Sequence, residues 1–174
     1  MTTLDPAHLD AQGKRAFENK NYKEAADYFQ QAAEGYTLGR ASLQAAEMMN
    51  NASVALLQAG KSNEALNAAL GTDEIFAQAK DVKRQAMALG NQAAALEALS
   101  RYEEAIQNNE QSADLFGQVN EGDLRAMVMK SAAAIKLKTG KVTDSAFKMM
   151  GSLDVKNNPN IFERILRFFL RFIK

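Results

Sequence analysis

The chain has 174 residues, of which 47% are hydrophobic, and its 21 Lys and Arg balance 21 Asp and Glu to a formal net charge of zero. This length fits one domain with a sizeable core, and the absence of cysteine excludes disulfides, thiolate zinc sites and a cysteine nucleophile. Because no broad basic face is indicated, nucleic acid is excluded as a partner.

The composition predicts an all-α protein. Much of the hydrophobic content is alanine, which favours helices and close helix–helix contact. The two prolines, Pro6 and Pro159, lie near the ends, so the chain between them is free to form helices joined by short turns. The first residues lack the pattern of a secretory signal, and no stretch has the ~20 apolar residues of a membrane span. We therefore expect a cytoplasmic location.

Hydrophobic periodicity predicts eight helices. They are expected near residues 6–19, 22–36, 41–59, 62–79, 82–99, 102–118, 122–138 and 142–150. Asp5 before Pro6 is typical of a helix N-cap followed by proline at the first helical position. Ser100 with Glu103 predicts a capping box that opens the helix 102–118.

The helices recur in pairs with a period of 40 residues, held without gaps. Three columns of small residues, one acidic column, one turn column and two columns of large apolar residues repeat at this spacing. A single helical pair cannot bury both of its apolar faces, so similar units stack and share them. The columns are Gly13, Ser53, Ala93, Ala133; Ala25, Ala65, Ala105, Ser145; Ala32, Thr72, Ser112, Ser152; Glu24, Glu64, Glu104, Asp144; Lys20, Gly60, Ser100, Gly140; Leu9, Met49, Leu89, Met129; and Tyr36, Phe76, Phe116.

This spacing of small and aromatic residues resembles a tetratricopeptide repeat (TPR). The first unit, GKRAFENKNYKEAADYFQQA, is close to the family pattern, and the third, NQAAALEALSRYEEAIQNNEQS, nearly so. The second and fourth depart from it, with Ser62 and Val142 where Tyr22 and Tyr102 stand. The unit is longer than the usual 34 residues and is similar to the long-helix TPRs of kinesin-light-chain-like and cell-polarity adaptors. The resemblance implies a right-handed α-α solenoid of four helical hairpins over roughly residues 6–152.

The residues provide no evident catalytic set, so we expect a non-enzyme without cofactor or metal. The only histidine, His8, lies beside the N-terminal cap. The acidic column is explained more simply by helix capping than by catalysis or metal binding, because its residues lie in the first turn of each second helix and complement the helix dipole. A Gly-rich phosphate loop, a nucleophile–base set and a metal cluster are all missing from the sequence.

The TPR resemblance implies a concave groove lined by the first helix of each pair. The family's groove positions carry over to Lys14, Asn51, Asn91 and Lys130, with Val54, Ala94 and Ala134 between them. Asn51 and Asn91 share a register and resemble a short asparagine ladder, in which each carboxamide grips the N–H and C=O of a bound peptide. The alternative is that both are exposed asparagines bonded only to water. Other TPR proteins bind the carboxylate of a chaperone tail with a clamp of conserved side chains. Of the clamp positions, only Asn51 has the matching residue in this chain.

The C-terminal residues differ from the repeats. Residues 1–152 form the expected repeat domain, 153–160 a polar linker, and 161–174, IFERILRFFLRFIK, an amphipathic helix. Its apolar residues fill an arc of roughly 200° and its cations fall within roughly 80° on the other side. Residues 1–160 carry a net charge of −3 and residues 161–174 a net charge of +3. The candidate contact residues are Phe162, Ile165, Phe168, Phe169, Phe172, Arg164, Arg167 and Arg171.

Three roles fit this C-terminal helix. Its aromatic face and cationic stripe suit a membrane interface, where arginines meet anionic headgroups. It could instead cap the last repeat or insert into the groove, or it could join two chains into a homodimer. We expect a non-catalytic adaptor that binds a protein or peptide segment in its groove, with the C-terminal helix tethering it to a membrane surface or regulating the groove. The alternative is a structural assembly subunit in which this helix caps the solenoid or drives homo-oligomerisation.

Overall fold

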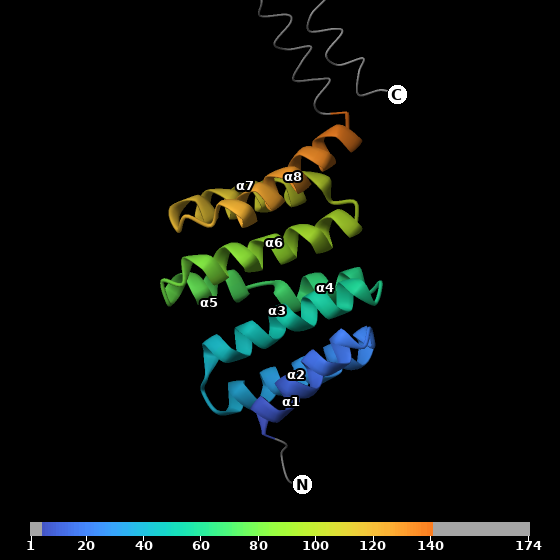
Figure 1. Cartoon of the computed structure of the whole chain (residues 1–174), viewed down its shortest axis with the longest axis vertical. Coiled ribbons are helices and arrows are strands. Elements are labelled where there is room, and N and C mark those ends of the chain that lie inside the picture. Colours follow the sequence, from blue (N-terminus) through green and yellow to red (C-terminus); the bar gives the residue numbers. More distant parts are fainter. Residues whose placement is uncertain (1–4, 141–174) are drawn as a thin grey trace, which may run out of the picture. The chain divides into compact units, whose positions relative to one another are not determined.

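The computed structural model describes residues 5–140, which form helices and the turns between them (Figure 1). The prediction of an all-α protein is confirmed. The predicted helix 142–150 lies outside the described residues. The helices are α1 (Pro6–Glu18), α2 (Tyr22–Leu38), α3 (Ser42–Gln58), α4 (Ser62–Ala69), α5 (Thr72–Gln78), α6 (Val82–Ala98), α7 (Tyr102–Gln118) and α8 (Gly122–Lys138).

Apart from the pair α4 and α5, successive helices pack against each other as antiparallel partners (Figure 1). Helix α2 lies between α1 and α3, and α6 packs on α7. The short helices α4 and α5 both contact α3 and α6, so together they take one position in a succession of seven. Residues up to Ile135 form one compact unit, and of the second unit, which begins at Lys136, the structure describes residues 136–140.

The core is built on small side chains that let the helices approach closely. Ala25, Ala65 and Ala105, from one sequence column, are completely buried. At Gly13 a Cβ would lie 2.7 Å from Cε1 of Phe29, so the Phe29 ring packs against the backbone of α1. The small-residue prediction is therefore confirmed for α1–α7, whereas Ala133 on α8 is exposed.

A left-handed residue ends a helix every 20 residues. At each of these turns the N–H of the left-handed residue donates to the carbonyl three residues earlier. In the first six turns the N–H of the following residue also donates to the carbonyl five residues before it, as in the Schellman motif. For Gly60 and Lys61 these bonds, to Leu57 and Leu56, are 3.0 and 2.9 Å long. The sequence showed only alternate turns, and the full set is Lys20, Arg40, Gly60, Lys80, Ser100, Asn120 and Gly140.

The predicted capping box at Ser100 is wrong. Ser100 adopts φ 60° as the left-handed residue after α6, and Arg101 takes the N-cap position of α7 without a side-chain capping bond. Arg101 instead forms an ion pair with Glu104, with Nη2 2.6 Å from Oε2, and Lys61 pairs likewise with Glu64. The predicted acids in the first turns of α2, α4 and α7 are confirmed, while Asp144 lies outside the described residues. The Asp5 cap is also confirmed, because its carboxylate accepts from the Ala7 N–H.

The predicted continuous helix 62–79 is wrong, because the chain breaks at Leu70 and Gly71. Leu70 has an extended ψ of 132°, and Gly71 has φ 78°, in the left-handed region that glycine adopts without strain. The hydroxyl of Thr72 donates to the Ala69 carbonyl at 2.7 Å. Gln92 of α6 donates to the same carbonyl at 3.2 Å. Buried side chains thus replace the backbone hydrogen bond that the break removes.

The left-handed turns allow a test by opposite substitutions. Lys80→Gly should raise the free energy of unfolding by about 0.5–1 kcal/mol, because Lys80 has φ 58° and glycine relieves that strain. Gly60→Ala should lower the free energy of unfolding by about 1 kcal/mol. The cause is the left-handed backbone conformation alone, since no atom lies within 4 Å of the added Cβ. Urea unfolding measures both. Lys80→Ala is the control, and a gain equal to that of Lys80→Gly would contradict the explanation.

Candidate functional site

Two of the four predicted groove residues line one hollow. Lys14 comes from α1 and Asn51 from α3, and Val54, also predicted for the groove, lies one turn beyond Asn51. The hollow has a volume of about 240 Å³ and is lined by Lys14, Phe17, Glu18, Phe29, Asn51 and Val54. Its floor and walls are apolar, and its polar groups are the ammonium, carboxylate and carboxamide contributed by three of these residues.

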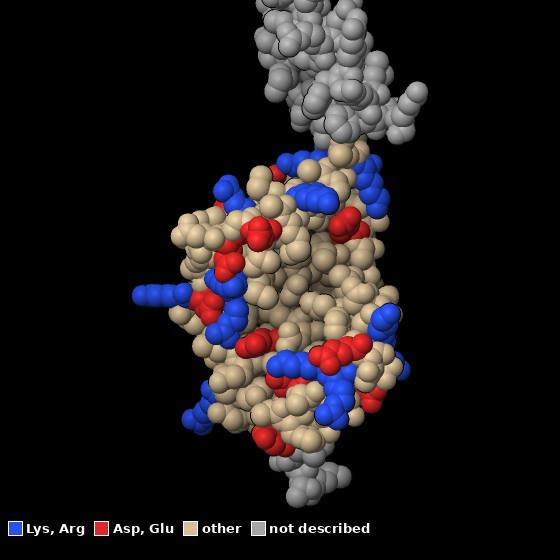
Figure 2. All heavy atoms as spheres, viewed as in Figure 1, with Lys and Arg blue, Asp and Glu red and all other residues tan. Residues whose placement is uncertain are grey.

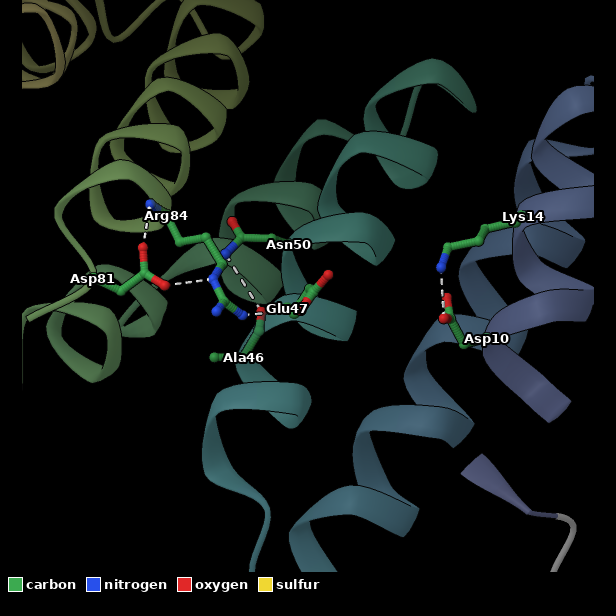
Figure 3. A network of polar contacts seen from close by, with 7 residues as sticks. All are labelled: Asp10, Lys14, Ala46, Glu47, Asn50, Asp81 and Arg84. Atoms are coloured by element: carbon green, nitrogen blue, oxygen red, sulfur yellow. Dashed lines mark hydrogen bonds and ion pairs between the residues drawn. The ribbon is translucent and has the colours of Figure 1, made fainter. Parts of the chain in front are cut away.

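The positive charge of Lys14 already has a partner. Its Nζ lies 2.7 Å from Oδ2 of Asp10, one turn earlier on α1 (Figure 3). This hydrogen bond raises the pKa of Lys14 above its usual value. The lysine is therefore charged at neutral pH, and Asp10 compensates that charge.

Asn91 has a different environment from Asn51. Its Nδ2 donates to Oδ1 of Asn50 at 3.2 Å. Asn50 is buried and donates in turn to the Ala46 carbonyl at 3.3 Å, as Figure 3 shows, and to the Thr72 hydroxyl at 3.1 Å. The two ladder residues share a register without sharing a role, because Asn91 is tied to a buried neighbour. Lys130 is exposed on α8 and does not line the hollow.

A buried polar network surrounds the break between α4 and α5. Besides its bond to Ala69, Gln92 donates to Oδ1 of Asp73 at 2.6 Å and accepts from Nδ2 of Asn108 at 3.1 Å. Its carboxamide is thus held from α4, α5 and α7 at once. Sequence reasoning missed Asn50 and Gln92, although both are buried amides directly beside the two ladder positions.

A second hollow of about 260 Å³ lies beside this network. The ion pair of Arg101 and Glu104 stands at its edge. Leu66, Leu70, Gln92, Leu96, Arg101, Glu104, Gln107 and Asn108 line it. Because the amides of Gln92 and Asn108 are bonded to each other and its charges are paired, this hollow has the character of structural packing.

Arg84 joins three helices through ion pairs, which Figure 3 shows, and through an aromatic ring. Its Nη1 lies 3.1 Å from Oε2 of Glu47 on α3, and its Nε lies 2.7 Å from Oδ2 of Asp81. The guanidinium carbon also lies 5.5 Å from the ring centroid of Phe76 on α5. The Arg84 backbone N–H, followed by its guanidinium, lowers the pKa of Asp81 below its usual value of 3.8.

Across residues 5–140, no three His, Asp or Glu side chains are grouped so that they could hold a metal ion. His8 is exposed and its Nε2 lies 2.7 Å from Nε2 of Gln12, one turn later on α1. None of the helices described is long and apolar enough to cross a membrane.

The predicted contact residues of the C-terminal helix lie outside the described residues: Phe162, Ile165, Phe168, Phe169, Phe172, Arg164, Arg167 and Arg171. Comparison of the chain with models of protein families and with curated proteins finds no match. Within the described residues, the candidate site consists of the hollow between α1, α2 and α3 and the half-buried positions on α6 in register with it, Asn91 and Ala94.

Asp81 provides a pH-dependent test of the cap on α6. Its pKa is lower folded than unfolded, so its stabilisation is present above pH ~4 and is lost as pH falls through the folded pKa. Asp81→Ala should lower the free energy of unfolding by about 1 kcal/mol at pH 7, with the difference narrowing toward pH 3. Urea unfolding at pH 3 to 7 measures this, with exposed Asp114→Ala as the control. A difference that is constant with pH would contradict the assignment.

Proposed function

We propose that residues 6–152 form a right-handed solenoid of four TPR-like hairpins that acts as a non-catalytic adaptor. It binds a segment of a partner protein on the face presented by α1, α3, α6 and α8. The turns at 20-residue intervals and the antiparallel packing support the repeat architecture. The TPR resemblance implies that the partner is a protein or peptide segment.

The observation that carries the proposal is a stripe of accessible positions with the period of the repeat. Asn51 and Val54 on α3 are half-buried, and so are Asn91 and Ala94 on α6, forty residues later. The residues between them, at positions 52, 53, 92 and 93, are buried. We call these four half-buried residues the groove stripe. It gives α3 and α6 the same outward face, as a shared binding surface requires.

The surface chemistry also suits a protein segment. Met87 and Met127, again forty residues apart, are 47% and 60% exposed, and methionine adapts readily to different partners. Figure 2 shows one face whose middle, at the level of α3 and α6, consists of uncharged residues with charged side chains around it. An uncharged centre with a charged rim is the usual anatomy of a protein interface.

Blocking the groove stripe tests this function. Ala94→Arg should abolish the capture of partner proteins from a lysate of the source cells, because a long charged side chain then covers the stripe. The matched control is Ala77→Arg, at an exposed position on α5. Quantitative mass spectrometry of the captured proteins and thermal unfolding are the measurements. An unchanged set of captured proteins in a folded Ala94→Arg variant would refute the groove.

For residues 161–174 we propose a tether to an anionic membrane surface or a regulator of the groove. The support is the sequence alone, with four phenylalanines and four cations among 14 residues. Co-sedimentation with liposomes should rise with anionic lipid content, since each cation near such a surface contributes about 1 kcal/mol. Phe168→Glu should weaken it more than tenfold, because a buried aromatic side chain is worth about 2–3 kcal/mol. Co-sedimentation that depends neither on anionic lipid content nor on Phe168→Glu would contradict the proposed membrane tether.

The second candidate is a structural assembly subunit, favoured by exposed apolar side chains on α8. Met127 and Met129 are both more than half exposed. Exposed apolar side chains offer contact area to a partner, so α8 is a candidate surface for a second chain. Light scattering separates the candidates: a dimer that becomes a monomer when residues 159–174 are deleted favours assembly, and a monomer at all concentrations favours the adaptor.

A further inference from the structure

We propose that the partner segment is anchored by one bulky apolar side chain in the hollow between α1, α2 and α3, with a basic residue beside that anchor. This inference rests on the proposed adaptor function and names the chemistry of its partner. The binding energy would then come mainly from one contact at the first hairpin instead of being spread evenly along the repeats. A few residues carry most of the binding energy in many interfaces.

The floor of the hollow is an aromatic ring that only this hairpin has among those described. Phe29 is 3% exposed and lies over Gly13, where a side chain would collide with it. The corresponding pair in the second unit is Ser53 and Ala69, and in the third it is Ala93 and Asn109. Neither pair can present a ring, so the deep apolar contact is restricted to the first unit.

The size of the hollow suits a side chain better than a small molecule. Its volume of about 240 Å³ lies below the roughly 300–1,000 Å³ of most ligand pockets. Phe17 and Val54 extend the apolar surface of Phe29 upward from the floor. A leucine, methionine or phenylalanine side chain of the partner would therefore contact Phe17, Phe29 and Val54.

Asn51 stands at the edge of the hollow ready to bind the backbone next to the anchor. Its carboxamide has no hydrogen-bond partner within residues 5–140, in contrast to Asn91, which donates to Asn50. A carboxamide offers two donors and one acceptor in a plane, which suits a peptide N–H and C=O. The free amide and the deep apolar floor thus occur at the same place.

The charges around the hollow favour a basic neighbour. Lys14 is compensated by Asp10 at 2.7 Å. Glu18 also lines the hollow, and it forms no ion pair with any residue in the described range. The uncompensated charge at the edge is therefore negative. Since Glu18 is exposed, its effect is on preference more than on affinity.

A phage-displayed library of random dodecapeptides, panned against the full chain, tests the anchor. The selected peptides should share a Leu, Met or Phe with a Lys or Arg within two positions. In fluorescence anisotropy with a labelled selected peptide, Val54→Glu and Asn51→Ala should each weaken binding at least tenfold. Asn67→Ala, at an exposed position on α4, is the matched control and should leave binding unchanged.

Charge reversal supplies a test that does not depend on the folding of a buried variant. Panning against Glu18→Lys should select Asp or Glu beside the apolar residue in place of Lys or Arg. An unaltered preference for basic neighbours would overturn the charge assignment, and selection of no common sequence would overturn the anchor.

The failure of the anchor and that of the adaptor give different results. If selected peptides bind Val54→Glu and Asn51→Ala normally but fail to bind Ala94→Arg, the anchor is wrong and the part of the groove stripe on α6, Asn91 and Ala94, remains the binding surface. If the peptides bind all three folded variants with equal affinity, both the anchor and the groove are wrong.

Discussion

Close approach between antiparallel helices is the constraint on which the rest of this structure depends. Alanines at 25, 65 and 105 are completely buried, and a glycine at 13 admits the ring of Phe29 against the backbone. At such separations almost any larger side chain would push two helices apart, so the small residues recur at a fixed interval. The large residues Phe76 and Phe116 then fill the spaces that remain.

Close packing also explains where the polar groups are buried. The break at Gly71 leaves the Ala69 carbonyl without its helical partner, and the hydroxyl of Thr72 and the amide of Gln92 bond to it. Leaving that carbonyl unpaired would cost about 1–3 kcal/mol. Asn50 extends the same network to Asn91, so an amide at a groove position becomes part of the scaffold. The buried polar side chains near Gly71 thus satisfy backbone hydrogen bonds, whereas Asn51 has no such role within residues 5–140.

The sequence predicted the elements well because helical periodicity and small residues in register are local and repeated signals. The TPR resemblance indicated Lys14 and Asn51 as groove positions, and both line one hollow in the structure. Three features were not predictable in the same way. Arg40 and Lys80 give no residue signal for a left-handed turn, the break at Gly71 depends on buried partners from α3 and α6, and the pairing of Lys14 with Asp10 is one of several available to a surface lysine. Each of these is decided by tertiary contacts or by competition among equivalent neighbours.

The location of the hollow has a consequence for how such a chain could change over time. All six residues that line it belong to α1, α2 and α3. Because each helix rests mainly on those next to it, helices gained or lost after α6 would alter the length of the molecule without removing any helix that packs on α1, α2 or α3. Modular growth at one end can therefore proceed while the other end keeps its original shape.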